Sequence, residues 1–373
     1  MKEYYIGPAG AGQKNELCFR TIAEALSHIS DADKRAEGAF PVSGNRMPEN
    51  EADGNHPSGQ ERNCGQVFTP VVIHIPAGVF TEHLEIRRPF LTLLGSTEGE
   101  TVITGSLHAR EILSDGKKRG TFRTQTVLVM THDFTARNIT FRNTAGFGEK
   151  AGQALSLYAD GDRLTFDHCR FLGCQDTLFT GPLPPEEYET GGFRGPGEFL
   201  PRINGRQYYR NCFIRGEIDF IFGSATAYFE NCELFSLKTD DLPAAENPAD
   251  QKIYGYVTAS SAPEGQKYGY VFEKCRLTGN CPPASCYLGR PWRDFAKAVY
   301  LNCEMGSHIH PAGWNDWKKE NARKTVFFAE YRSEGPGGSS RKRAPFSRQL
   351  SEKETRDFTK EKVLAGQDGW DPS

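Results

Sequence analysis

The chain has 373 residues, of which 37% are hydrophobic and 25% are charged, and its formal net charge is −3. This length allows a large buried core, and the near balance of charge, with no dominant basic stripe, argues against a nucleic-acid partner. The 39 glycines and 22 prolines favour many short strands and turns over long helices.

The first residues carry no export or membrane signal. Met1 is followed directly by Lys-Glu-Tyr-Tyr-Ile, which is not the apolar core of a signal peptide. No run is apolar and long enough to span a bilayer. We therefore expect a cytoplasmic monomer with no membrane partner, or a secreted protein if a leader has been removed.

The ten cysteines form no Cys-x-x-Cys pair of the kind found in common zinc and redox sites. Cys169 and Cys174 are spaced by five, as are Cys281 and Cys286. We expect the cysteines to be reduced, small, buried residues, and we expect no metal and no cofactor.

The N-terminal part predicts a strand and a capping helix. Residues 3–7 resemble a short strand, and residues 18–29 have apolar side chains at helical spacing. A short helix of this kind would cover the open end of a sheet, where backbone groups are otherwise unpaired. Residues 35–66 are polar and predict a surface insertion.

An internal repeat follows the predicted strands at 71–75 and 91–95. Six segments share an aromatic residue followed three positions later by Cys or Thr. They are Phe141 and Thr144, Phe166 and Cys169, Tyr209 and Cys212, Phe229 and Cys232, Phe272 and Cys275, and Tyr300 and Cys303. Repeats of 20 to 25 residues with short strands predict an all-β, single-stranded parallel β-helix in which these residues stack as core. The alternative is a β-sandwich with coincidental spacing.

Two longer gaps interrupt the repeat. The 43 residues from Cys169 to Cys212 include a run rich in Pro and Gly at 181–205, and without this loop about one repeat remains. The gap from Cys232 to Cys275 has room for an additional coil through residues 254–257. Residues 346–373 form a predicted C-terminal tail with a helix at 351–364, docked through Trp370. The whole chain is thus expected to be one domain.

Two acids occupy equivalent positions of this repeat. Asp176 is seven residues after Cys169, and Asp219 is seven residues after Cys212. In adjacent coils their carboxylates would lie roughly 5 Å apart. Two carboxyl groups that close cannot both ionise at their usual pKa, so one stays ionised and the other holds a proton. This pair would supply a nucleophile or base and a general acid.

Amide, cationic and aromatic side chains accompany the acids. Gln153 and Gln175 offer N–H donors for a developing oxyanion. Arg290 could hold an aspartate ionised, and Trp292 offers a flat face on which a sugar could stack. Each residue also has a structural interpretation, because an Asp can bind turn amides, Gln can form ladders, Arg can bridge a surface and Trp can pack in the core. Their joint occurrence favours a catalytic site.

The order of these segments resembles the pectin methylesterase family. The segments that carry this resemblance are Gly78-Val79-Phe80-Thr81-Glu82, Gly120-Thr121-Phe122, Gln153-Ala154-Leu155-Ser156-Leu157, Gln175-Asp176-Thr177-Leu178, Asp219-Phe220-Ile221-Phe222-Gly223, Leu288-Gly289-Arg290-Pro291-Trp292 and Pro311-Ala312-Gly313-Trp314. The resemblance implies a right-handed parallel β-helix that hydrolyses the C6 methyl ester of galacturonate units in pectin or oligogalacturonides, without metal or cofactor.

The resemblance also implies roles for individual residues. Asp219 matches the nucleophile that forms an acyl-enzyme, and Asp176 matches the general acid that then becomes the base. Gln153 and Gln175 match the oxyanion donors, and Arg290 matches a substrate contact that also positions Asp219. The further substrate-binding candidates are Gln153, Trp292, Thr121, Phe222 and Trp314.

The sequence departs from the family pattern at several positions. Phe80 replaces the usual Tyr, Ser224 stands where Asn is usual, and Ser260 stands where Gln is usual, which puts substrate contacts from that turn in doubt. The loop at 181–205 lies between the two acids in sequence and is expected beside the cleft, where it could shorten the groove and favour oligomers.

Other functions fit less well. A pectate lyase would need a calcium site of clustered acids, and a polygalacturonase would need further aspartates near a His; we find neither set. A non-catalytic oligogalacturonide-binding protein would have lost a catalytic residue, and none is lost. A serine esterase is disfavoured because no Gly-x-Ser-x-Gly elbow occurs.

Overall fold

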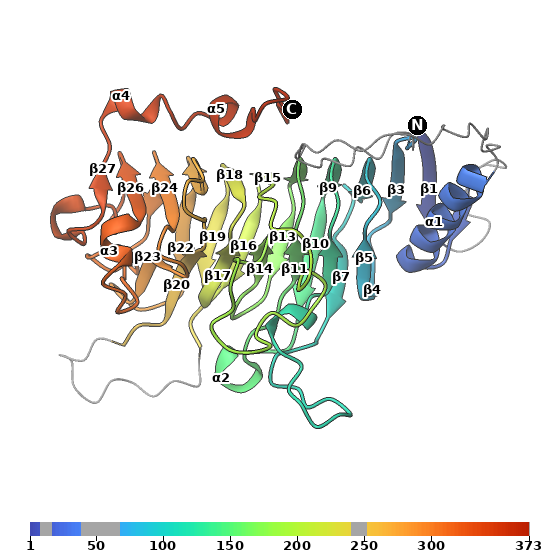
Figure 1. Ribbon diagram of the computed structural model, residues 1–373, viewed down its shortest axis with the longest axis horizontal. Coiled ribbons are helices and arrows are strands. Elements are labelled where there is room, and N and C mark those ends of the chain that lie inside the picture. The colour runs from blue at the N-terminus through green and yellow to red at the C-terminus, as the bar shows by residue number, and fades with distance from the viewer. Residues whose placement is uncertain (8–16, 39–67, 240–251, 373) are drawn as a thin grey trace, which may run out of the picture.

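The computed structural model describes residues 1–7, 17–38, 68–239 and 252–372, and these form a parallel β-helix (Figure 1). Three sheets run along its axis, and the pairings between neighbouring strands are parallel. Each coil between residues 71 and 291 contributes one strand to each sheet, so chain segments about one repeat apart lie side by side. The predicted fold class is confirmed.

The order of the strands in space differs from their order along the chain. Sheet 1 consists of β2 (Leu17–Phe19), β1 (Lys2–Ile6), β3 (Val71–Ile75), β6 (Leu91–Gly95), β9 (Phe134–Arg137), β12 (Leu164–Asp167), β15 (Arg206–Arg210), β18 (Thr226–Glu230), β21 (Tyr270–Glu273), β24 (Lys297–Leu301), β26 (Phe327–Tyr331) and β27 (Arg348–Gln349). Sheet 2 consists of β25 (Glu304–Met305), β22 (Arg276–Gly279), β19 (Glu233–Ser236), β16 (Phe213–Gly216), β13 (Arg170–Leu172), β10 (Ile139–Asn143), β7 (Thr101–Gly105) and β4 (Gly78–Thr81). Sheet 3 consists of β23 (Cys286–Pro291), β20 (Gly255–Ser260), β17 (Ile218–Gly223), β14 (Leu178–Thr180), β11 (Leu157–Ala159), β8 (Val127–Val129) and β5 (Leu84–Ile86).

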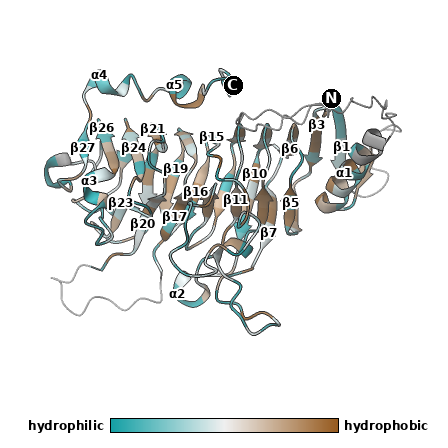
Figure 2. Cartoon of the chain, in the orientation of Figure 1, coloured by the Kyte–Doolittle hydropathy of each residue, from teal (hydrophilic) through white to brown (hydrophobic). Residues whose placement is uncertain are grey.

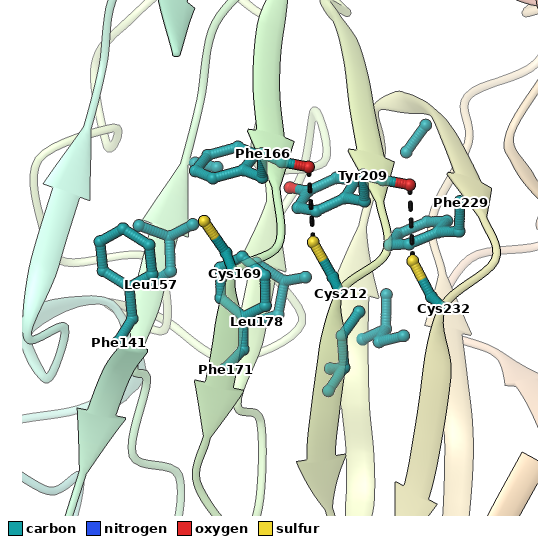
Figure 3. Close-up of a cluster of buried hydrophobic side chains, with 14 of the residues drawn as sticks. Phe141, Leu157, Phe166, Cys169, Phe171, Leu178, Tyr209, Cys212, Phe229 and Cys232 are labelled. Carbon is teal, nitrogen blue, oxygen red and sulfur yellow. Dashed lines mark hydrogen bonds between the residues drawn. The ribbon is translucent and has the colours of Figure 1, made fainter. Parts of the chain in front are cut away.

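Hydrophobic residues are concentrated on the strands (Figure 2), and like residues stack in the core between the sheets (Figure 3). The rings of Phe166, Tyr209, Phe229, Phe272 and Tyr300 lie in register on sheet 1, with neighbouring centroids 4.5 to 4.9 Å apart. The following cysteines are buried, and each thiol of the inner coils lies within 3.4 to 3.5 Å of a carbonyl oxygen of the preceding coil. Burial raises the pKa of the Cys169 thiol to about 12. The predicted stacked core is confirmed for these five segments.

Phe141 belongs to a different ladder. It lies on β10 of sheet 2, where its register partner is Phe171, and their rings stack 5.5 Å apart. The residue of sheet 1 that aligns with Phe166 is Ala136. The prediction that Phe141 and Thr144 begin the repeat was therefore wrong, because Phe141 lies on sheet 2 and the other five aromatic residues lie on sheet 1. An aromatic residue can fill the core from any of the three sides of a coil.

The two long gaps each amount to a single coil. β12 pairs with β15, and β18 pairs with β21, so no further strand lies between them on sheet 1. Residues 254–257 contribute to β20 of the ordinary coil, and the additional coil expected there is wrong. In the first gap the loop at 181–205 connects β14 to β15, as predicted.

Helix α1 (Ile22–Gly38) covers the N-terminal end of the β-helix (Figure 1). Ile22, Ala25 and Ile29 are buried against the first coils, and the carboxylate of Glu82 accepts hydrogen bonds from the N–H groups of Ile22 and Ala23. The predicted cap is confirmed, although the helix begins at Ile22, after the strand β2, and continues past residue 29. It includes residues 35–38 of the predicted insertion; residues 39–66 of that insertion lie outside the described part of the chain.

The C-terminal tail lies along sheet 1 and contains two short helices, α4 (Glu352–Thr355) and α5 (Lys360–Leu364), instead of one long helix. Val363 and Leu364 are buried against β15 and β18. Trp370 packs in the same cluster, as predicted, and Arg206 binds Asp368 at 2.8 Å. The other helices are α2 (Gly148–Ala151), α3 (Ala322–Thr325) and 3₁₀ turns at Thr121–Arg123 and Ser340–Lys342. No described helix is long and apolar enough to cross a membrane.

Candidate active site

Asp176 and Asp219 occupy the same position on adjacent coils. β14 pairs with β17 so that Leu178 aligns with Ile221, and each acid lies two residues before its aligned residue. Both have a left-handed backbone, with φ of 59° at Asp176 and 52° at Asp219, a conformation in which Asp is tolerated better than most residues. The predicted common register is confirmed, and it brings the two carboxyl groups into one cavity.

Arg290 holds only one of the two acids. Its Nε donates to Oδ1 of Asp219 at 2.8 Å, and its Nη2 donates to Oδ2 at 2.6 Å. The guanidinium carbon lies 3.9 Å from the ring centre of Tyr256 and 3.7 Å from that of Trp317. This stacking restrains the planar group, and the two parallel hydrogen bonds fix the orientation of Asp219.

The surroundings of the two carboxyl groups shift their pKa values to different extents. Burial and then the charge of Asp219 raise the pKa of Asp176 well above its ordinary value. Burial also raises the pKa of Asp219, but the charge and hydrogen bonds of Arg290 oppose that shift. At neutral pH the pair therefore favours a proton on Asp176 and a negative charge on Asp219.

The two glutamines complete this group. Gln153 and Gln175 both line the cavity, and the N–H of Ala154 donates to the carbonyl oxygen of Gln175 at 3.1 Å, which ties the two segments together. The Gln175 side chain also hydrogen-bonds the carboxyl group of Asp176. All five predicted catalytic residues thus lie in one place.

The cavity has a volume of about 520 Å³ and is walled by aromatic rings. Trp292 lies 5.7 Å from Phe222 and 6.3 Å from Phe122 between ring centres. Thr121 contributes to the same wall. Trp292, Thr121 and Phe222 therefore line the same cavity as the five predicted catalytic residues.

Trp314 is not at this site. Only 2% of its surface is exposed, and its ring stacks on Phe328 with centres 4.4 Å apart. Its indole Nε1 donates to Glu330 at 3.3 Å, so its polar atom has an internal partner. The prediction of a substrate contact is corrected: this tryptophan fills the core beneath the last coils.

Several residues of the cavity were not predicted. All except Ala259, which lies on β20 beside Phe222, come from segments outside the repeat register, and among these only the aromatic and cationic residues carry a signal in the sequence. The unpredicted residues are Phe122, Glu187, Tyr188, Glu189, Gly192, Phe193, Ala259, Arg293, Trp317 and Lys319.

The loop at 181–205 forms one wall of the cavity, as predicted. Tyr188 donates to the carbonyl oxygen of Trp292 at 3.1 Å and lies over the guanidinium of Arg293 at 3.8 Å. Lys319 donates to the carbonyl oxygens of Pro291 and Trp292 at 2.9 and 3.0 Å, and to the Tyr188 hydroxyl at 3.3 Å. Burial and then the charge of Arg293 lower the pKa of Lys319 to about 8. These contacts bind the loop to the end of β23.

Two departures from the family pattern have a structural explanation. Ser224 is buried and its hydroxyl pairs with the hydroxyl of Ser261 at 2.8 Å. Ser260 is also buried and its Oγ accepts from the N–H of Lys297 at 3.1 Å. Neither serine lines the cavity, and from this turn Ala259 faces it instead.

A metal centre is not apparent in the part of the chain that the structure describes. Within it, no three His, Cys, Asp or Glu side chains are grouped so that they could hold a metal ion.

Comparison with known proteins identifies the family. A sequence model described as pectinesterase matches residues 61–182 and 195–367. The chain belongs to the pectinesterase family. Its pectinesterase relatives include Pectinesterase 31 of Arabidopsis thaliana, which is 34% identical over 294 residues and covers 77% of this chain and 80% of the relative. Pectinesterase QRT1 of the same plant is 33% identical over 307 residues, covering 80% and 70%.

Solved structures of the pectinesterase family have the same fold. The pectin methylesterase PemA from Erwinia chrysanthemi is 28% identical, with a TM-score of 0.70 over 100% of this chain and 98% of that chain. A pectin methylesterase in complex with a hexasaccharide gives the same identity and TM-score, covering 100% and 99%. The family model leaves residues 183–194 unmatched, and this stretch contains Tyr188 and Phe193 of the cavity wall.

Proposed function

We propose that the chain hydrolyses the C6 methyl ester of galacturonate units in pectin or oligogalacturonides, with Asp219 as nucleophile. The observation that carries this proposal is the asymmetric pair: Arg290 forms two hydrogen bonds with Asp219, whereas Asp176 faces the same cavity and forms no ion pair with any cation of the described residues. An ionised carboxylate next to a protonated carboxyl group is what acyl transfer to an Asp requires.

In the first half-reaction a carboxylate oxygen of Asp219 attacks the ester carbonyl carbon. The resulting oxyanion accepts hydrogen bonds from the carboxamide N–H groups of Gln153 and Gln175. When the carbon–methoxy bond breaks, Asp176 gives its proton to the departing methoxide, and methanol leaves. The galacturonate acyl group is then joined to Asp219 as an anhydride. Losing one oxyanion donor typically lowers kcat by about 10² to 10³.

In the second half-reaction the ionised Asp176 takes a proton from water. The hydroxide attacks the same carbonyl carbon, the bond to Asp219 breaks, and the galacturonate carboxyl group is released. Asp176 is left protonated and Asp219 ionised, so the site returns to its starting state. The chemistry needs no group beyond these side chains.

We further propose that the loop at 181–205 adapts the cleft to short substrates. Tyr188 and Phe193 wall the cavity, and contacts to Arg293 and Lys319 hold this wall in place. A wall of this kind limits the number of sugar units that lie in the cleft at once. Methanol release should then be faster from short methyl-esterified oligogalacturonides than from long, highly esterified pectin at equal ester concentration. Faster release from the polymer would contradict this.

The activity is tested by product analysis. The protein is incubated with methyl-esterified oligogalacturonides, and methanol, unsaturated product and new reducing ends are measured in the same samples. We expect methanol alone. Unsaturated product would indicate a lyase and new reducing ends a glycosidase, and either result in place of methanol would overturn the proposed reaction.

A further inference from the structure

A third carboxyl group is buried next to the catalytic pair. Glu217 lies between β16 and β17, two residues before Asp219, and only 3% of its surface is exposed. Its Oε1 accepts a hydrogen bond from the N–H of Gly148 at 2.6 Å. No cation forms an ion pair with Glu217 among the residues that the structure describes. Burying a carboxyl group costs free energy unless hydrogen bonds or opposite charges compensate for the lost water. Carboxyl groups buried in this way are often found at functional sites.

Gly148, the hydrogen-bond partner of Glu217, contacts Gln175, one of the two glutamines assigned to the oxyanion. Gly148 is the first residue of α2, and its bare α-carbon lies against the side chain of Gln175: a Cβ at this position would stand 2.8 Å from the Gln175 Cβ and would overlap its Oε1. Real Cβ atoms do not approach that closely, so Gly148 is required here by contact. The position of the Gly148 backbone therefore sets the position of the Gln175 carboxamide.

The same segment leads to the second glutamine. α2 ends at Ala151, and Gln153 follows after Gly152. The carbonyl oxygen of Gln153 accepts from Ala109, and Ala154 donates to the carbonyl oxygen of Gln175. One short segment, fixed at its start by Glu217, thus reaches both carboxamides of the oxyanion site.

We propose that Glu217 is a positioning residue for the ester hydrolysis: by holding the Gly148 backbone, its carboxyl group keeps the Gln175 carboxamide in place to stabilise the oxyanion. This role rests on the proposed function, because it concerns an oxyanion that only acyl transfer creates.

The charge of Glu217 has a second effect. The titratable groups around it are Glu149 on α2, Asp176 and Cys174 on the chain before β14, and Cys281. Burial raises the pKa of Glu217, and the Gly148 hydrogen bond opposes this. When ionised, Glu217 adds to the burial and to the Asp219 charge that raise the pKa of Asp176. It therefore helps Asp176 to retain the proton that it donates.

The test compares three variants with the wild type for methanol release from methyl-esterified oligogalacturonides. Glu217→Ala removes the hydrogen bond, and Gly148→Ala pushes directly on Gln175. Each should lower kcat by about 10- to 100-fold with KM changed by less than about threefold, because a small misplacement of a catalytic group affects the transition state most. The double variant should be no slower than about the worse single variant, since both act through one contact.

Glu217→Gln separates positioning from charge. The amide oxygen of the new glutamine can still accept a hydrogen bond from the N–H of Gly148. At low pH the kcat of Glu217→Gln should therefore be within about threefold of the wild-type value, unlike that of Glu217→Ala. The lost charge should lower the pKa of Asp176, so the alkaline limb of the pH profile should move to lower pH. A merely structural role would change Tm without moving this limb. Glu233→Gln, which removes a charge paired with Arg276 on sheet 2, is the matched control and should leave the profile unchanged.

The wild type is measured first, so that a failure of the proposed function appears as absent methanol in the wild type itself. The Glu217 proposal fails separately if Glu217→Ala, folded by its thermal melt, keeps kcat within about twofold of the wild type. It also fails if Gly148→Ala has wild-type kcat, or if the losses of the two variants multiply in the double variant. Should Glu217→Ala not fold, Glu217→Gln and Gly148→Ala decide alone.

Discussion

At the scale of single residues, the two aspartates differ in their neighbours and not in their own conformation. Both lie at the same point of a coil with a left-handed backbone. Only Asp219 receives the two hydrogen bonds of Arg290, which comes from β23, two strands along sheet 3. The division of roles between nucleophile and acid therefore depends on residue 290.

Arg290→Lys should show how much of this depends on geometry. A lysine keeps the positive charge but loses the planar fork and the stacking between Tyr256 and Trp317. We expect kcat for methanol release to fall by about 10²-fold. Arg276→Lys, at the exposed pair with Glu233, is the control and should have no effect. Full activity of Arg290→Lys would mean that charge alone suffices.

Asp176→Asn should abolish methanol release and should stabilise the fold relative to the wild type as pH rises. The pKa of Asp176 is raised in the folded state, so the protonated carboxyl contributes its full stability below its unfolded pKa of about 3.9, and that contribution is lost as pH rises through the folded pKa. An amide mimics the protonated form at every pH. The difference in Tm between variant and wild type should therefore grow in favour of the variant between about pH 4 and neutral pH, while methanol release is lost. A Tm difference independent of pH would contradict the raised pKa.

At the scale of elements, the aromatic ladder of sheet 1 holds the catalytic coils in register. Phe229 is fully buried, with the rings of Tyr209 and Phe272 each 4.6 Å away. Phe229→Ala should lower the free energy of unfolding by about 3–5 kcal/mol, because the rings above and below cannot close the gap. Phe213→Ala, on the half-buried outer side of β16, should cost less than half as much. If denaturant melts gave the two variants equal losses in the free energy of unfolding, the ladder would contribute no more to stability than the outer side of β16 does.

At the scale of the whole molecule, the tail and the cleft lie on different sheets. α5 and Trp370 cover sheet 1, whereas the catalytic residues come from sheet 3 and its loops (Figure 1). Truncation after Leu350 exposes the apolar cluster around Tyr208 and Tyr228. We expect a lower Tm and a tendency to aggregate, with kcat at low temperature unchanged within about twofold. A selective loss of kcat in the folded, truncated protein would show that the tail supports the site.

The sequence was sufficient for the parts that follow the repeat. The spacing of Asp176 and Asp219 from their cysteines predicted a common register, because a coil repeats its core residues at fixed positions. It was insufficient where no register applies. Trp314 fills the core, although its motif gave no sign of which way the ring points. Tyr188 and Lys319 come from loops whose course depends on tertiary contacts.

The most direct measurement is methanol release by Asp219→Ala, assayed well below the Tm of the variant. The Tm should fall, because Arg290 loses its buried partner, so a thermal melt establishes the temperature at which the variant is folded. Removing the carboxylate removes the atom that bonds to the substrate, and methanol release should therefore fall to the background rate. If the folded variant kept more than about a few per cent of the wild-type kcat, Asp219 would not be the nucleophile and the mechanism would be wrong.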